Sequence, residues 1–197
     1  DSELRAVILD CENRADVTAT KQNAGGIAGW QPLGLIKGCA NTGNIDASSG
    51  DHAGGIAGQS AGYIRNCSAK RAVTGSNFVG GIAGSGSVVT DCRSMAVLTG
   101  KECVGGILGV QAQSNTEQPV LGNLYAFNEK DPGGIDGISY EGATAPMTIE
   151  EFLAVGAFNA DTELKLTDIT PKEPVGQDIT VLENWKVTMK DTGIRKL

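Results

Sequence analysis

The cysteines are the residues in this sequence whose chemistry and spacing first suggest a reactive site. Four of the five share one position in a repeating pattern: Cys11, Cys39, Cys67 and Cys92. A cysteine nucleophile needs a base, and the single histidine, His52, lies in a loop-like stretch away from all of them. No C-x-x-C pair occurs, as a zinc cluster would require. We therefore expect buried free thiols, with a disulfide, catalysis or metal binding as the alternatives.

Cys103 stands outside this series. We expect it to be the most exposed or reactive of the thiols, with plain packing as the alternative.

Carboxylates are the second candidate, because an enzyme that cleaves polysaccharides gathers several acids on one face. Asp10 and Asp91 share a position in the repeat but lie three repeats apart, which is about 14 Å at the spacing of stacked strands. This separation is too large for a glycosidase pair. The other acids that we considered occupy different positions: Asp46, Asp51 and Glu102. We expect these carboxylates to cap turns or face solvent rather than bind calcium.

Two further features could bind ligands. The run GGIAG lacks the G-x-G-x-x-G and P-loop patterns, and its recurrence argues against a phosphate site. Trp30 stands where other repeats carry Gln59 or Ser85, so it is a candidate for an outward binding face, with packing as the alternative for Trp30 and for Trp185.

Composition excludes several classes of protein. The net charge of -7 argues against a nucleic-acid partner, since such proteins present a basic face. No run of about 18 apolar residues exists to span a membrane. We expect no cofactor, and the start at Asp1 without a methionine suggests a mature form or, as we prefer, part of a larger polypeptide.

The whole pattern is an internal repeat of 25 to 29 residues. GGIAG or a close variant begins at Gly25, Gly54, Gly80, Gly105 and Gly133. Branched apolar residues keep the same phase, and we predict that they form three inward-facing columns. The first is Ile27, Ile56, Ile82, Ile107 and Ile135; the second is Ile8, Ile36, Ile64, Val89 and Leu121; the third is Val17, Ile45, Val73 and Leu98. The fifth repeat should place Leu124 at the cysteine position.

Glycine interrupts every few residues, which excludes helical repeats and favours short strands. We predict an all-β protein, a right-handed parallel β-helix of about five rungs, in residues 1–137, with the coil itself over 4–137. Its glycines should supply turns with positive φ or close approach of neighbouring walls.

Residues 138–197 should form a small C-terminal α+β cap or a hinge to a following domain. A capping box with Thr148 and Glu151 predicts a short helix through about Val155, with Phe152 facing inward. Later segments read as strands at 164–166, 179–181 and 185–189, with a loop at 170–176.

These repeats resemble the GLUG repeat, which is named for its Gly-Leu-any-Gly core. The resemblance covers about residues 4–137, and the Asn-Cys step of the family is matched by Asn66-Cys67. Asp10 and Asp91 replace the asparagine, Gly38 departs further, and Asn123-Leu124 keeps the frame without the thiol.

The resemblance implies a secreted or cell-surface bacterial protein, like adhesins and the non-catalytic parts of IgA1-specific metallopeptidases. It implies a non-enzymatic spacer, adhesion or interaction platform whose partner is a host glycan or a protein. No HExxH zinc motif is present, since the sequence has one histidine. The alternative is a carbohydrate-active β-helix enzyme, a polysaccharide lyase or hydrolase, and a cleft holding several acids with lysine or arginine would favour it.

Overall fold

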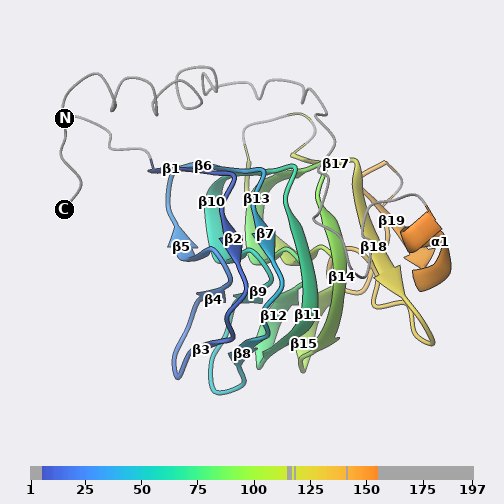
Figure 1. Cartoon of the computed structure of the whole chain (residues 1–197), viewed down its shortest axis with the longest axis horizontal. Coiled ribbons are helices and arrows are strands. Elements are labelled where there is room, and N and C mark those ends of the chain that lie inside the picture. Colours follow the sequence, from blue (N-terminus) through green and yellow to red (C-terminus); the bar gives the residue numbers. More distant parts are fainter. Residues whose placement is uncertain (1–5, 115–116, 118, 141, 155–197) are drawn as a thin grey trace.

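The chain folds into the β-solenoid that the repeat predicts, with about four complete turns and part of a fifth (Figure 1). The structure is a computed structural model that describes residues 6–114, 117, 119–140 and 142–154. Three parallel sheets, A, B and C, form its walls, and each turn of the chain contributes strands to them in that order. Each strand pairs with its counterpart one repeat later, so the hydrogen bonds run along the axis of the coil.

The strands are short because glycine or a turn follows each apolar run. Sheet A contains β1 (Ala6–Leu9), β5 (Ala28–Gln31), β6 (Gly34–Lys37), β10 (Ala57–Arg65), β13 (Ala83–Thr90), β16 (Leu108–Gln111) and β17 (Val120–Leu121). Sheet B contains β2 (Glu12–Asn13), β3 (Val17–Thr18), β7 (Ala40–Asn41), β8 (Ile45–Ala47), β11 (Ser68–Gly75), β14 (Arg93–Thr99), β18 (Asn123–Phe127) and β19 (Thr144–Thr148). Sheet C contains β4 (Ala24–Gly25), β9 (Ala53–Gly54), β12 (Asn77–Gly80) and β15 (Glu102–Gly105).

Strand register places the predicted columns in the interior. Ile8 pairs with Ile36, Ile36 with Ile64 and Ile64 with Val89. The column from Val17 to Leu98 is likewise in register. The main core joins the second column to Ile56, Ile82, Ile107 and Ile135, with Ile8 and Ile27 partly buried at its edge. A second cluster holds the column from Val17 to Leu98.

The fifth turn is shifted by one residue from the predicted alignment. Val120, and not Leu121, pairs with Val89 and enters the main core. Asn123, and not Leu124, reaches the cysteine position, since Leu124 pairs with Arg93. The connection 112–119 precedes this turn. Its extra residues break the regular spacing that aligns the earlier repeats, so the alignment of the fifth repeat could not be read from that spacing.

The glycines of GGIAG serve close approach more than positive φ. A Cβ at Gly81 would overlap the Gly106 carbonyl oxygen and Ser94 Oγ. A Cβ at Gly84 would lie 2.5 Å from the Phe78 carbonyl oxygen and 2.7 Å from His52 Cα. The motif therefore marks the places where neighbouring turns nearly touch.

Stacking continues beyond Gly137, where the predicted coil ends. β19 pairs with β18 over five residues, and α1 (Ile149–Ala154) follows it at the end of the solenoid (Figure 1). The capping box is confirmed, because Glu151 N–H donates to Thr148 Oγ1 at 3.2 Å and Thr148 N–H donates to Glu151 Oε2 at 3.0 Å. Phe152 is fully buried, as predicted. The predicted strands and loop after residue 160, and Trp185, lie outside the described residues.

Candidate binding groove

The residue before each repeat cysteine adopts a left-handed backbone conformation. φ is 51° at Asp10, 49° at Asn66 and 56° at Asp91, and glycine takes the same place at Gly38 and Gly122, with φ of 65° and 67°. Aspartate, asparagine and glycine are the residues that tolerate this conformation. The Asn-Cys step of the repeat is therefore explained by a turn that requires a left-handed residue before the cysteine.

The cysteines after these turns hold neighbouring rungs together. The thiols of Cys39, Cys67 and Cys92 are buried and free. Each lies 3.7 to 3.9 Å from a carbonyl oxygen of the preceding turn, and closer to one in its own turn. Burial raises the pKa of Cys67 well above that of an ordinary thiol. These thiols therefore act as small buried packing groups.

Asn123 takes the place of cysteine at the last step of this column. Its Oδ1 accepts a hydrogen bond from the Cys92 amide at 2.9 Å, and its Nδ2 donates to the Val89 carbonyl at 2.9 Å. Nδ2 also donates to the Ala143 carbonyl at 3.0 Å. The amide side chain thus joins three segments where the repeat changes.

Two predictions about exposure of the thiols need correction. Cys11 is the exposed thiol, whereas Cys103 is only half-exposed, contrary to the expectation that it would be the most accessible. Cys11 lies in the first described turn, at the end of the column. Burial, with Asp136 and Glu102 nearby, raises the pKa of Cys103, so its thiolate is disfavoured at neutral pH.

Cys103 belongs to a second left-handed column that the sequence did not reveal. Asn23, His52, Phe78 and Cys103 each stand two residues before a Gly-Gly pair, with φ between 53° and 66°. The His52 and Phe78 rings stack with centroids 4.7 Å apart and an interplanar angle of 14°. His52 therefore has a structural partner, and burial lowers its pKa against the opposing effect of Asp51.

A hollow opens where the third inward column stops. Gly105 follows Cys92 by 13 residues, but Gly133 follows Asn123 by only 10, so the fifth turn has no room for the strand that would cover Leu98. Among the described residues, β14 pairs with β18 only at Arg93 and Ser94. Its remaining residues, from Met95 to Thr99, have no strand beside them on that side in the part of the chain that the structure describes, although the Ala96 amide donates to Ser94 Oγ at 3.3 Å.

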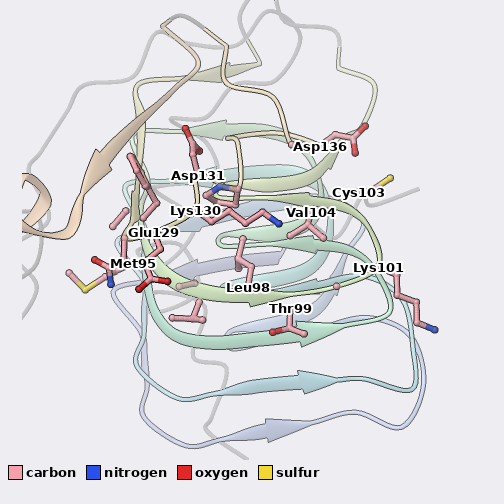
Figure 2. A pocket seen from close by; sticks show the side chains of 18 of the residues that line it. Met95, Leu98, Thr99, Lys101, Cys103, Val104, Glu129, Lys130, Asp131 and Asp136 are labelled. Carbon is pink, nitrogen blue, oxygen red and sulfur yellow. The ribbon is translucent and has the colours of Figure 1, made fainter.

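We call this hollow the open-end groove. It has a volume of about 950 Å³, and its floor includes Leu98 and Val104, which are partly buried and pack against the second core cluster. Charged side chains form its rim. They come from the connection that follows β18 and from the chain near β15 and the last glycine motif: Lys101, Glu102, Glu129, Lys130, Asp131 and Asp136. Figure 2 shows Lys130 and Asp131 on one side, Leu98 and Thr99 below them, and Lys101 and Cys103 at the far side.

One rim carboxylate already has partners. Asp131 Oδ1 accepts hydrogen bonds from the buried Tyr125 hydroxyl at 2.7 Å and from the Gly133 amide at 2.8 Å. The Tyr125 hydroxyl also contacts Ser139 Oγ. Burial raises the pKa of Tyr125 to about 12. Asp131 therefore fixes the chain that crosses the end of the solenoid.

The other carboxylates considered in the sequence are dispersed, with Glu102 alone in the groove. Asp46 accepts a hydrogen bond from the Ser48 amide at 2.9 Å, and Asp51 accepts one from Asn77 Nδ2 at 3.0 Å. Trp30 lies on β5 with 62% of its surface exposed, away from the groove. Glu129, Asp131 and Asp136 were not predicted from the sequence. Glu129 stands six residues after Asn123, where other repeats carry an apolar residue, and that break was the available signal.

The fold and this groove define a parallel β-solenoid in which, over the described ranges, one edge of sheet B has no neighbouring strand. No family model matches the chain, and comparisons with curated proteins and with solved structures find no similar protein. The part of the chain that the structure describes contains no helix long and apolar enough to cross a membrane. Within the same residues, no three side chains of histidine, cysteine, aspartate or glutamate gather in a way that could hold a metal ion.

Proposed function

We propose that this chain is a non-enzymatic repeat module of a secreted or cell-surface bacterial protein, a spacer and interaction platform. We further propose that it binds an extended protein segment in the open-end groove. The location on the bacterial surface rests on the resemblance to GLUG repeats. The observation that carries the binding function is the edge of β14 beyond Ser94, which has no neighbouring strand among the described residues and lies above an apolar floor.

A free sheet edge of this kind suits a partner in strand conformation. Main-chain groups beyond Ser94 have no strand on the side facing away from β11 among the residues that the structure describes. An added strand would pair with them and place alternate side chains over Leu98, as in other cases of strand addition. The rim offers both charge signs, which would select flanking residues of the partner.

A displayed library of random linear peptides tests this function. Peptides enriched on the full chain should lose affinity for Leu98→Glu, which charges the floor of the groove. They should keep it for Trp30→Glu, because Trp30 lies on β5, outside the groove, with 62% of its surface exposed. Thermal unfolding of both variants checks that each remains folded.

Backbone N-methylation of an enriched peptide gives a second test that leaves the protein unchanged. In an added strand, alternate amides of the peptide point toward β14 and donate to it. Methylation of these amides should lower the affinity, whereas methylation of the amides that point away from β14 should leave the affinity unchanged. Equal binding of all methylated forms would overturn the proposal. Failure to enrich any peptide, with specific binding on a glycan array instead, would also overturn it.

The second candidate is a carbohydrate-active enzyme, a polysaccharide lyase or hydrolase. The specific observation in its favour is that the groove gathers acids with two lysines, Lys101 and Lys130. Against it, Asp131 already accepts two hydrogen bonds that hold the fold. Turnover in a polysaccharide-cleavage assay that Glu129→Gln and Asp136→Asn abolish would favour the enzyme over the interaction module.

A further inference from the structure

A column of small residues accompanies the third inward column at the end of the sheet B strands. Two residues after each large apolar member stands alanine or glycine: Ala19, Ala47, Gly75 and Gly100. Strand pairing, and the hydrogen bonds that extend it, stack these positions from turn to turn. We call them the corner column, because the chain bends there from sheet B toward sheet C. Each turn therefore contributes a large apolar residue, one further residue and then a small one.

Sheet C supplies the residues that pack against the corner column. These residues also stack in register, and they grow from alanine to valine along the solenoid: Ala24, Ala53, Val79 and Val104. They form the second core cluster or pack against it, together with Ala19 and Ala47. The corner between the two sheets is therefore a closely packed part of the core.

The size of a corner residue follows the size of its sheet C neighbours. Fully buried Ala47 shares its cluster with the two alanines of sheet C. A Cβ at Gly75 would lie 2.9 Å from both Ala53 Cβ and Val79 Cγ2. A Cβ at Gly100 would lie 2.7 Å from Val79 Cγ2 and 2.8 Å from Val104 Cγ2. Glycine therefore stands where sheet C carries valine, because no room remains for a side chain.

The open-end groove lies where the next member of both columns would stand. Leu98 is on its floor, and Gly100, Val104 and Pro132 also line it. Pro132 precedes Gly133 as Val104 precedes its own glycine pair, so it holds the sheet C position of the fifth turn. A corner residue placed in the groove would meet Val104 and Pro132, and both are larger than alanine. The groove therefore repeats the surroundings of Gly100.

We propose that the protein segment bound in the open-end groove runs parallel to β14 and carries a valine, isoleucine or leucine, then any residue, then glycine. The apolar side chain covers Leu98, and the glycine lies over Gly100 between Val104 and Pro132. The direction follows from the stacking of the solenoid, since the paired strands of all three sheets are parallel. This inference rests on the proposed function, because it names the segment that the groove selects.

The residue between the apolar residue and the glycine carries no selection. Its counterparts in the solenoid differ in charge and size, and Thr18, Asp46 and Thr99 are all exposed. A side chain at this place in the bound segment points away from the core in the same way. The partner is therefore recognised by two positions that are one residue apart.

A displayed library of random linear peptides, selected in parallel on the full chain and on Leu98→Glu, tests the motif. Peptides that require Leu98 should share the order apolar, any residue, glycine. Peptides that require Leu98 but lack this motif, or carry it in the reverse order, would overturn this inference and leave the proposed function standing. A library with no peptide that requires Leu98 would overturn the proposed function itself.

Synthetic variants of one enriched peptide measure the selection on the unaltered protein. Replacement of the glycine by alanine should weaken binding at least about fivefold, and replacement by leucine should weaken it further, because both overfill the corner. Replacement of the middle residue should leave the affinity unchanged. Equal affinity of the glycine and leucine peptides would overturn the inference.

A matched pair of protein variants tests whether Val104 sets the preference for glycine. Val104→Ala restores an alanine to sheet C, so the loss caused by alanine in the peptide should shrink. Val110→Ala, on β16 and outside the groove, should leave that loss unchanged. Thermal unfolding shows whether both variants are folded, and the peptide series on the unaltered chain decides the question if Val104→Ala is not. An unchanged preference in folded Val104→Ala would contradict the packing argument, and peptide binding that competes with self-association would assign the groove to a second copy of the chain and overturn the inference.

Discussion

Asn123 accepts a hydrogen bond from the Cys92 amide at 2.9 Å, at the point where the other turns carry cysteine. In the first step of the column the corresponding Cys11 amide meets the Cys39 sulfur at 3.5 Å. The amide side chain therefore makes a shorter contact than the thiol does, and it also binds the Val89 carbonyl. The column therefore ends in a side chain that supplies hydrogen-bond partners to backbone groups of the preceding turn.

Removal of this side chain should destabilise the C-terminal end of the solenoid. Asn123→Ala leaves the buried Cys92 amide without its acceptor, which costs roughly 1–3 kcal/mol. Asn123→Cys should cost less, because a thiol can receive this amide as Cys39 does. Urea unfolding measures both, with the exposed Asn128→Ala as the control. Equal stability of Asn123→Ala and the parent chain would contradict this role.

The glycines of the repeat should differ in importance according to what surrounds them. Gly84→Ala places a methyl group against backbone atoms of two turns and should cost about 3 kcal/mol. Gly137→Ala, at the same position of the last motif, meets nothing within 4 Å and should cost only about 1 kcal/mol for its φ of 73°. Thermal unfolding measures the difference, and equal losses would refute the close-approach explanation.

The five thiols should react in an order set by burial. Cys11 should label first with a maleimide, because it is exposed. Cys103 should follow slowly, since its pKa is raised and it is half-buried. Cys39, Cys67 and Cys92 should label only on unfolding. Peptide mapping after timed labelling at neutral pH checks the order, and early modification of Cys67 would show that the column opens in the native protein.

His52 should titrate below the ordinary range, because burial against Phe78 disfavours its charged form. With a depressed pKa in the folded state, the unfolded chain binds more protons below about pH 6.5, so stability should fall as pH drops through this region. Proton NMR follows the single imidazole directly. Phe78→Ala should raise the pKa of His52. An unchanged pKa would show that stacking against Phe78 is not what lowers it.

The sequence predicted the repeated part of the fold and failed where the repeat ends. The spacing of Ile36, Ile64 and Val89 was enough to set the register, because one residue of slip would reverse inside and outside. The fifth turn differed since Asn123 replaced cysteine after an insertion. The left-handed turns were present as the Asp, Asn or Gly before each repeat cysteine, but that step was read only as part of a family pattern.

The groove was harder to foresee, because it arises from a strand that is missing. The third column had four members where the others had five, and Glu129 occupied the place of the fifth. Recognising a groove also required knowing that the chain from Phe127 to Pro132 lines it. That path depends on the contact between Tyr125 and Asp131, which repeat spacing does not encode.

Amide hydrogen exchange in β14, resolved by NMR, tests the free edge most directly. In the full chain alone, the amides in 97–99 that point away from β11 should exchange fast, while those that point toward β11 should be protected. Addition of a groove-binding peptide should slow the first set and leave the exchange in β1 and β6 unchanged. Protection of the first set before any peptide is added, or no change after it, would contradict the account.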